Sequence, residues 1–331
     1  MDTKLKQKAD LMVENFYTLK RGFKWETTLI KHFAAMVHAT RDKRVDMGAL
    51  EEIKSFVKSE TSWTSYFRGT NQFVLTSLLY FEDNYKEVFR NSLIVYDKMK
   101  EQGFSKSQYS PLAAYTIAIE SERNEWDYKI KRMGDFYSKM KANHFWLTSS
   151  DDYVFAAVLA VTDLNVGETA ENIERCYSYL NARGFYKGND LQTLSHVLAI
   201  GEQSVDEKCG KAVELYYKLK ENGCKLQYSG LATLGLLALI TDDVDKIVRD
   251  VKEVYDYINS QDGYGFWSLD KSMRTILSAT LVSDLYVDDI KKGVYQVALG
   301  NSINAIIIAQ QQAAIAAAVA ASAAASASAS S

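Results

Sequence analysis

The sequence contains very little proline and cysteine. Its 331 residues include a single proline, Pro111, and three cysteines, Cys176, Cys209 and Cys224. No proline-rich linker marks a domain boundary. The odd number of cysteines argues against a disulfide framework, and their spacings match no zinc motif. Because residues 1–5 are charged and lack an apolar signal core, we expect a cytoplasmic protein with reduced thiols.

The chain also lacks a large excess of charge of either sign. Its net charge is −3, with acidic and basic residues interleaved, which argues against a nucleic-acid partner. Residues 293–331 contain no charged residue, but three glutamines interrupt their apolar run, which continues in alanine and serine. This composition does not suit a transmembrane helix. We therefore expect neither a nucleic-acid partner nor a membrane span.

Familiar catalytic motifs are missing as well. The sequence has no match to the phosphate-binding loop, the dinucleotide fingerprint or the nucleophile elbow. The four histidines, His32, His38, His144 and His196, show no zinc-binding spacing, and we expect them in partly buried or turn positions. We accordingly predict no cofactor and no metal site, and we favour a role other than catalysis.

A segment of about forty residues recurs along the chain. Its turn position holds an aromatic residue or a replacement for one, and the steps between copies are 40, 41, 41, 40, 39 and 40 residues. The seven positions are Phe23, Trp63, Phe104, Phe145, Phe185, Cys224 and Tyr264. A fixed period of this length is typical of repeat proteins, in which each unit buries its apolar face against its neighbours.

The turn has the pattern of a helix that ends at a glycine. Gly103 follows a run of helix-forming residues, so we expect it to adopt the left-handed conformation of a Schellman cap. This cap brings Met99 and Phe104 into contact. His144 stands where glycine is expected, and histidine tolerates positive φ better than most residues. The same arithmetic pairs Met140 with Phe145, Leu180 with Phe185, and Leu219 with Cys224.

The helices before and after each turn differ in polarity. The helix before the turn is amphipathic, whereas segments 153–161 and 234–240 after it are apolar on all sides. The second helices are therefore expected in an inner, buried layer. We predict an all-α protein of about eight helical hairpins, which form either a closed α/α toroid, the favoured arrangement, or an open α-superhelix.

The repeat period also predicts the domain boundaries. Residues 1–290 are expected to form the helical-hairpin repeat domain. Residues 291–325 are expected to form a final hairpin with an alanine-rich closing helix, its outer helix beginning near residue 287. Residues 326–331 form a serine- and alanine-rich tail that we expect to be disordered.

Acidic pairs occur at Asp151-Asp152, Asp242-Asp243 and Asp288-Asp289. They invite comparison with the aspartate-rich motifs of isoprenoid enzymes, but no Asp-Asp-x-x-Asp pattern is present. We expect each pair at the start of a helix, where aspartate accepts hydrogen bonds from free amides.

The rim formed by the starts of the inner helices is the candidate ligand site. Residues at this register position vary from copy to copy, and Trp146 and Trp267 lie nearby in the sequence. The candidate ligand-binding residues are Arg68, Tyr109, Asp151, Asp152, Asp190, Tyr228 and Asp270.

Over nearly its whole length the chain resembles a bacterial family catalogued as domain of unknown function 4003. The resemblance is carried by the Gly-Phe turns, by apolar second helices such as 112–118 and by the uncharged tail. It implies a bacterial cytoplasmic protein and assigns no functional residue. We favour a non-enzymatic scaffold that binds a peptide or protein. The alternative is an α/α-toroid enzyme that acts on a carbohydrate or isoprenoid-like substrate through the rim carboxylates.

Overall fold

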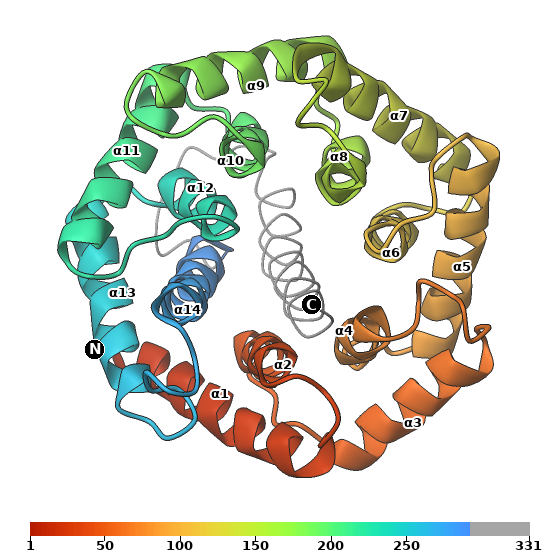
Figure 1. Ribbon diagram of the computed structural model, residues 1–331, viewed down its shortest axis with the longest axis horizontal. Coiled ribbons are helices and arrows are strands. Elements are labelled where there is room, and N and C mark those ends of the chain that lie inside the picture. The colour runs from red at the N-terminus through yellow and green to blue at the C-terminus, as the bar shows by residue number, and fades with distance from the viewer. Residues whose placement is uncertain (292–331) are drawn as a thin grey trace, which may run out of the picture.

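The computed structural model describes residues 1–291, which form fourteen α-helices, one short 3-10 helix and no strand (Figure 1). The outer helices are α1 (Thr3–Gly22), α3 (Met47–Ser59), α5 (Tyr85–Glu101), α7 (Trp126–Asn143), α9 (Val166–Asn181), α11 (Val205–Glu221) and α13 (Val244–Asn259). The inner helices are α2 (Thr28–Thr40), α4 (Thr70–Leu79), α6 (Ser110–Glu120), α8 (Tyr153–Val161), α10 (Asn189–Ala199), α12 (Gly230–Ile240) and α14 (Lys271–Lys291). The prediction of an all-α protein is confirmed for these residues.

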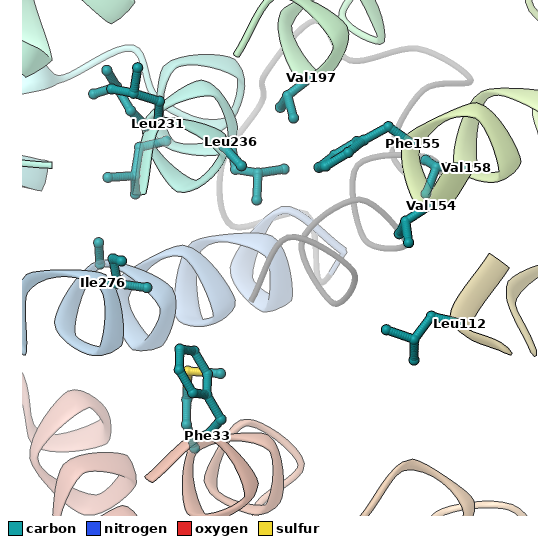
Figure 2. Close-up of a cluster of buried hydrophobic side chains, with 14 of the residues drawn as sticks. Phe33, Leu112, Val154, Phe155, Val158, Val197, Leu231, Leu236 and Ile276 are labelled. Atoms are coloured by element: carbon teal, nitrogen blue, oxygen red, sulfur yellow. The ribbon is translucent and has the colours of Figure 1, made fainter. Parts of the chain in front are cut away.

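The two layers differ in burial as their sequences require. All residues of α12 are buried, and all but the last residue of α8 are buried, because neither helix has a polar face. In α9 and α11, by contrast, only one side of the helix is buried. Figure 2 shows Phe33, Phe155 and Leu236 pointing into the space between the inner helices, so the middle of the molecule is apolar.

The inner helices all run in the same direction, so the molecule has two distinct faces. At their starts, the Asn71 amide donates to the Gln108 carbonyl (2.7 Å) and the Asn189 amide to Asp151 (3.0 Å). At their ends, the Gln203 amide donates to the Leu239 carbonyl (3.2 Å). We call the two surfaces the start face and the end face. The start face comprises segments 23–27, 60–69, 102–109, 144–152, 182–188, 222–229 and 260–270.

The first and last described helices lie against each other. Helix α1 contacts α13 and α14, and α14 also contacts α2 (Figure 1). The buried Lys8 ammonium pairs with Asp284 of α14 (2.9 Å) and donates to the Thr40 carbonyl at the end of α2 (3.1 Å). The Tyr264 hydroxyl donates to the Met12 carbonyl (3.2 Å). These polar contacts join α1 to the last described helix and to the loop that precedes it.

The described residues form seven hairpins. The predicted eighth hairpin (291–325) and the tail (326–331) lie outside them, apart from residue 291, the last of α14. Helix α14 runs without interruption from Lys271 to Lys291, so the prediction that a new helix begins near residue 287 is wrong. For the same reason, Asp288 and Asp289 lie within a helix and do not cap one. None of the helices in residues 1–291 is both long enough and apolar enough to cross a bilayer.

The predicted Schellman cap is confirmed at three turns. Gly103 has φ +92°, and the Phe104 amide donates to the Met99 carbonyl (3.0 Å). The same bond joins Phe185 to Leu180 (3.2 Å) and Cys224 to Leu219 (2.8 Å). The prediction for the fourth turn is wrong. There His144 has φ −134°, its own amide bonds to the Met140 carbonyl (2.9 Å), and Phe145 is exposed.

Candidate functional site

The start face brings together four of the seven residues predicted to bind a ligand. Asp151 and Asp152 lie at the start of α8, Asp190 lies in the first turn of α10, and Tyr109 lies just before α6. Asp151 connects two of these elements, since one of its oxygens accepts from the Asn189 amide (3.0 Å) and the other from the Ser149 hydroxyl (2.5 Å).

Asp152 is the most perturbed carboxyl of this group. The 3-10 helix Ser150–Asp152 begins with a capping box in which the Ser149 amide donates to Asp152 Oδ2 (3.1 Å). This bond confirms the prediction that the pair caps a helix. The residue is only 5 % exposed. Burial, and secondarily the charge of Asp151, raises the pKa of Asp152 to about 7.

His196 lies beside Asp152 in the interior. Its Nδ1 is 3.9 Å from Asp152 Oδ1, and within the described residues neither ring nitrogen has a hydrogen-bond partner. Burial lowers the pKa of His196 to about 3, with a further contribution from His144. Since burial disfavours the charged form of both side chains, this contact is not an ion pair at neutral pH. It is a buried acid next to a neutral imidazole.

Three further polar side chains lie in this part of the molecule: Gln192, Asp190 and Tyr109. The buried Gln192 amide donates to the Thr148 hydroxyl (3.0 Å), whereas its Oε1 has no partner among the described residues. Burial raises the pKa of Asp190. It also raises the pKa of Tyr109, to which the charges of Asp151 and Asp152 contribute in the same direction. Because its pKa is about 7, Asp152 can hold or release a proton near neutral pH.

The other three predicted residues serve local structure or face solvent. The Arg68 guanidinium donates to the backbone carbonyls of Ser62, Lys58 and Thr61. Asp270 accepts from the Met273 amide (3.0 Å) and so caps α14. Tyr228 has φ +52°, and its side chain is exposed.

A second feature of the start face is a set of exposed aromatic side chains. Trp25, Trp63, Trp146 and Trp267 are 88–98 % exposed, whereas Trp126, the remaining tryptophan, is buried in α7. The exposed aromatic residues of this face are Trp25, Trp63, Tyr66, Phe145, Trp146, Tyr186, Tyr228, Phe266 and Trp267. They come from six of the seven loops, so the face as a whole is rich in aromatic surface.

The sequence placed Tyr228, Trp146 and Trp267 at or near the rim but did not predict the whole exposed set. For Trp25, Tyr66, Trp146, Tyr186, Phe266 and Trp267 the signal was an aromatic residue one to three positions after the repeat's turn position. Tyr186 follows the buried Phe185, and Trp25 follows the buried Phe23. At these two turns the turn residue is buried and the aromatic residue after it is exposed, so the repeat's turn position alone does not identify the exposed ring.

Basic side chains accompany these aromatics. Lys24, Lys106, Lys187 and Lys225 lie in start-face loops and form no ion pair within residues 1–291. Helices α5, α7 and α11 also end in lysine at this face and have acidic residues in the first turn at their opposite ends. Both preferences follow from the helix dipole, and they make the start face more basic than the end face.

The family model described as "Protein of unknown function (DUF4003)" matches residues 15–312. The chain belongs to this family. The resemblance inferred from the Gly-Phe turns and apolar helices is thereby confirmed. Among curated proteins, the DUF4003 chain is similar to "Uncharacterized protein YeaA" of Bacillus subtilis (strain 168), with 24 % identity over 318 residues that cover 94 % of each chain. No solved structure gives a significant match.

Three hollows in the described part of this DUF4003 chain are not lined by Asp152. One is bounded by Gln7, Asp10 and Arg44, and another by Glu174 and Asp206. A small apolar recess lies between α2 and α4. Among residues 1–291, no three histidine, cysteine or acidic side chains are grouped as metal ligands would be.

Proposed function

We propose that this chain is a non-enzymatic binding scaffold with the architecture of an α/α toroid, and that it binds its partner through the start face. The closed arrangement is supported by the contacts of α1 with α13 and α14. Reduced, buried Cys176, Cys209 and Cys224 suit a cytoplasmic location.

The observation that carries the proposal is the exposure of four tryptophans on one face. Tryptophan is enriched in the parts of interfaces that contribute most binding energy, and large apolar patches on a soluble protein mark interaction sites. The end face has no comparable set, since Tyr128 at the beginning of α7 is its main exposed aromatic residue in the described chain. This asymmetry supports the start face as the binding surface.

The sequence favours a peptide or protein as the partner. The exposed aromatic residues of the start face come from six of its seven loops. An extended partner surface therefore suits this face better than a single short peptide.

A photo-cross-linking amino acid tests this assignment in bacterial cells. It is placed at Trp63 on the start face and, as a matched control, at Tyr128 near the end face. We expect discrete cross-linked products from position 63 that position 128 does not give. Equal products from both positions, or no product with either protein or lipid from position 63, would contradict the proposal.

The alternative function is an enzyme that uses rim carboxylates on a carbohydrate or isoprenoid-like substrate. It is supported by Asp152, whose pKa of about 7 suits a general acid or base, and by the adjacent neutral His196. Turnover of such a substrate by the purified protein, lost in Asp152→Asn, would establish this alternative.

A further inference from the structure

We infer that the start face binds the surface of a lipid bilayer that contains anionic lipids. This inference rests on the proposed function, because it names the partner of the same face. The chain would then be a peripheral membrane protein that lies flat on the bilayer, with the axis of the inner helices perpendicular to it.

The spread of the aromatic side chains favours a flat and extended partner. Trp25 precedes α2 and Trp146 precedes α8, and these two helices lie on opposite sides of the molecule (Figure 1). Tyr186 precedes α10 and Trp267 precedes α14, on one side of the line from α2 to α8. Trp63 precedes α4, on the other side of that line. A sugar or short peptide cannot contact all of them at once. A plane can, since every one of these loops lies on the same face.

The residue types favour a bilayer over a protein surface. Tryptophan and tyrosine settle at the headgroup level of membranes, where the ring meets apolar chains and the polar edge meets water. Lysine distinguishes the two partners, since it is depleted in the cores of protein interfaces but attracted to anionic headgroups. Lys24 is adjacent to Trp25, and Lys187 is adjacent to Tyr186, so cation and ring reach the same surface together.

The distribution of charge sets the orientation. Acidic residues dominate the end-face loops, which include the pairs Glu82-Asp83 and Asp242-Asp243. A negatively charged bilayer repels that face and attracts the lysine-bearing start face. The start-face loops themselves are balanced, with six basic and six acidic side chains, so the start face is the more basic one only relative to the end face and through the basic ends of the outer helices.

Vesicle binding by the purified full chain tests the inference. The probes are vesicles of phosphatidylcholine alone and of phosphatidylcholine mixed with phosphatidylglycerol, and binding is measured by co-sedimentation. Tryptophan emission gives a second readout, because four of the five tryptophans lie on the start face and only Trp126 is buried. We expect binding to the anionic vesicles with a blue shift of the emission, weakened by added salt.

Matched variants test the surface that binds. Lys187→Gln should weaken binding about fivefold, the contribution of one lysine near an anionic surface, whereas Lys43→Gln on the end face should leave it unchanged. Trp146→Ala should weaken binding about tenfold if the ring buries about 60 Å² of apolar surface, and Tyr128→Ala serves as its control. Thermal unfolding of each variant checks that its fold is intact.

The inference is overturned if anionic vesicles do not bind the chain, or if Lys187→Gln and Lys43→Gln bind equally. It is also overturned if lipid-free protein self-associates through the start face and ignores vesicles. Cross-links from position 63 to a protein, in the absence of vesicle binding, would overturn the membrane partner and leave the proposed function standing. Failure of both experiments would overturn both.

Discussion

Replacing Asp152 by asparagine should stabilise the protein at neutral and alkaline pH. The Asp152 carboxyl is 5 % exposed and lies beside His196, whose ring nitrogens have no hydrogen-bond partner in the described part of the chain. Asparagine keeps an oxygen that can accept from the Ser149 amide, as Asp152 Oδ2 does (3.1 Å). It removes the charge that the interior disfavours.

The pKa of Asp152 gives the magnitude and the sign. The folded state raises this pKa from 3.8 to about 7, so between those values the folded protein binds a proton that the unfolded chain has released. The ionised carboxylate therefore costs the wild type stability as pH rises from 4 to 7. The shift corresponds to about 4 kcal/mol above pH 7, and about 2 kcal/mol of this cost is present at pH 5.

Urea unfolding at pH 5 and pH 8 measures this difference. We expect Asp152→Asn to exceed wild type by about 4 kcal/mol at pH 8 and by about 2 kcal/mol at pH 5. Every other residue is common to both proteins, so the comparison isolates the effect of the Asp152 carboxyl. Asp163→Asn, an exposed change in the loop after α8, is the control. An advantage that does not change with pH, or a loss of stability at pH 8, would refute the reasoning.

Two further substitutions test the caps and the contact between the ends of the chain. Gly184→Val should cost at least about 1 kcal/mol, because Gly184 has φ +92° and a Cβ there would lie 3.0 Å from the Tyr217 hydroxyl. Gly210→Ala in α11 is its control, and equal thermal unfolding temperatures would contradict the cap assignment. Lys8→Ala should cost about 3 kcal/mol, since it leaves the mostly buried Asp284 carboxylate without its 2.9 Å partner. Lys6→Ala, which removes an exposed pair, should cost less than about 0.5 kcal/mol in urea unfolding, and an equal cost for both would show that the Lys8 contact is unimportant.

Local structure was predictable because it depends on neighbours in the sequence. The Gly-Phe turns at 103–104 and 184–185 form the expected caps, since glycine at positive φ and the bond back to C3 involve only six residues. The same pattern failed at His144, where the residue lacks glycine's freedom and the chain leaves the helix at φ −134°. The buried aromatic residue of the turn was also not predictable at 60–69. Trp63 occupies the repeat's turn position but is exposed, whereas Phe67 is buried.

The candidate site was predictable only in part. The register of the repeat placed Asp151, Asp152 and Asp190 at the starts of inner helices, and the structure brings them to one region. Nothing in the sequence distinguished Asp152 from Asp151, because they differ only in how deeply α8 and α10 enclose them. His196 is 44 residues from Asp152, so its position beside that carboxyl depends on packing between hairpins.

The sequence by itself determined the repeat period, the helical hairpins and the apolar character of the inner helices, because each follows from spacing and polarity within about forty residues. Only the tertiary structure decided that seven hairpins bring α14 against α1 and α2, since that contact depends on the angle accumulated from one hairpin to the next. It also decided which aromatic side chains remain in water. Whether an aromatic side chain is exposed depends on how its loop packs against neighbouring hairpins, and the sequence of one repeat does not specify that packing.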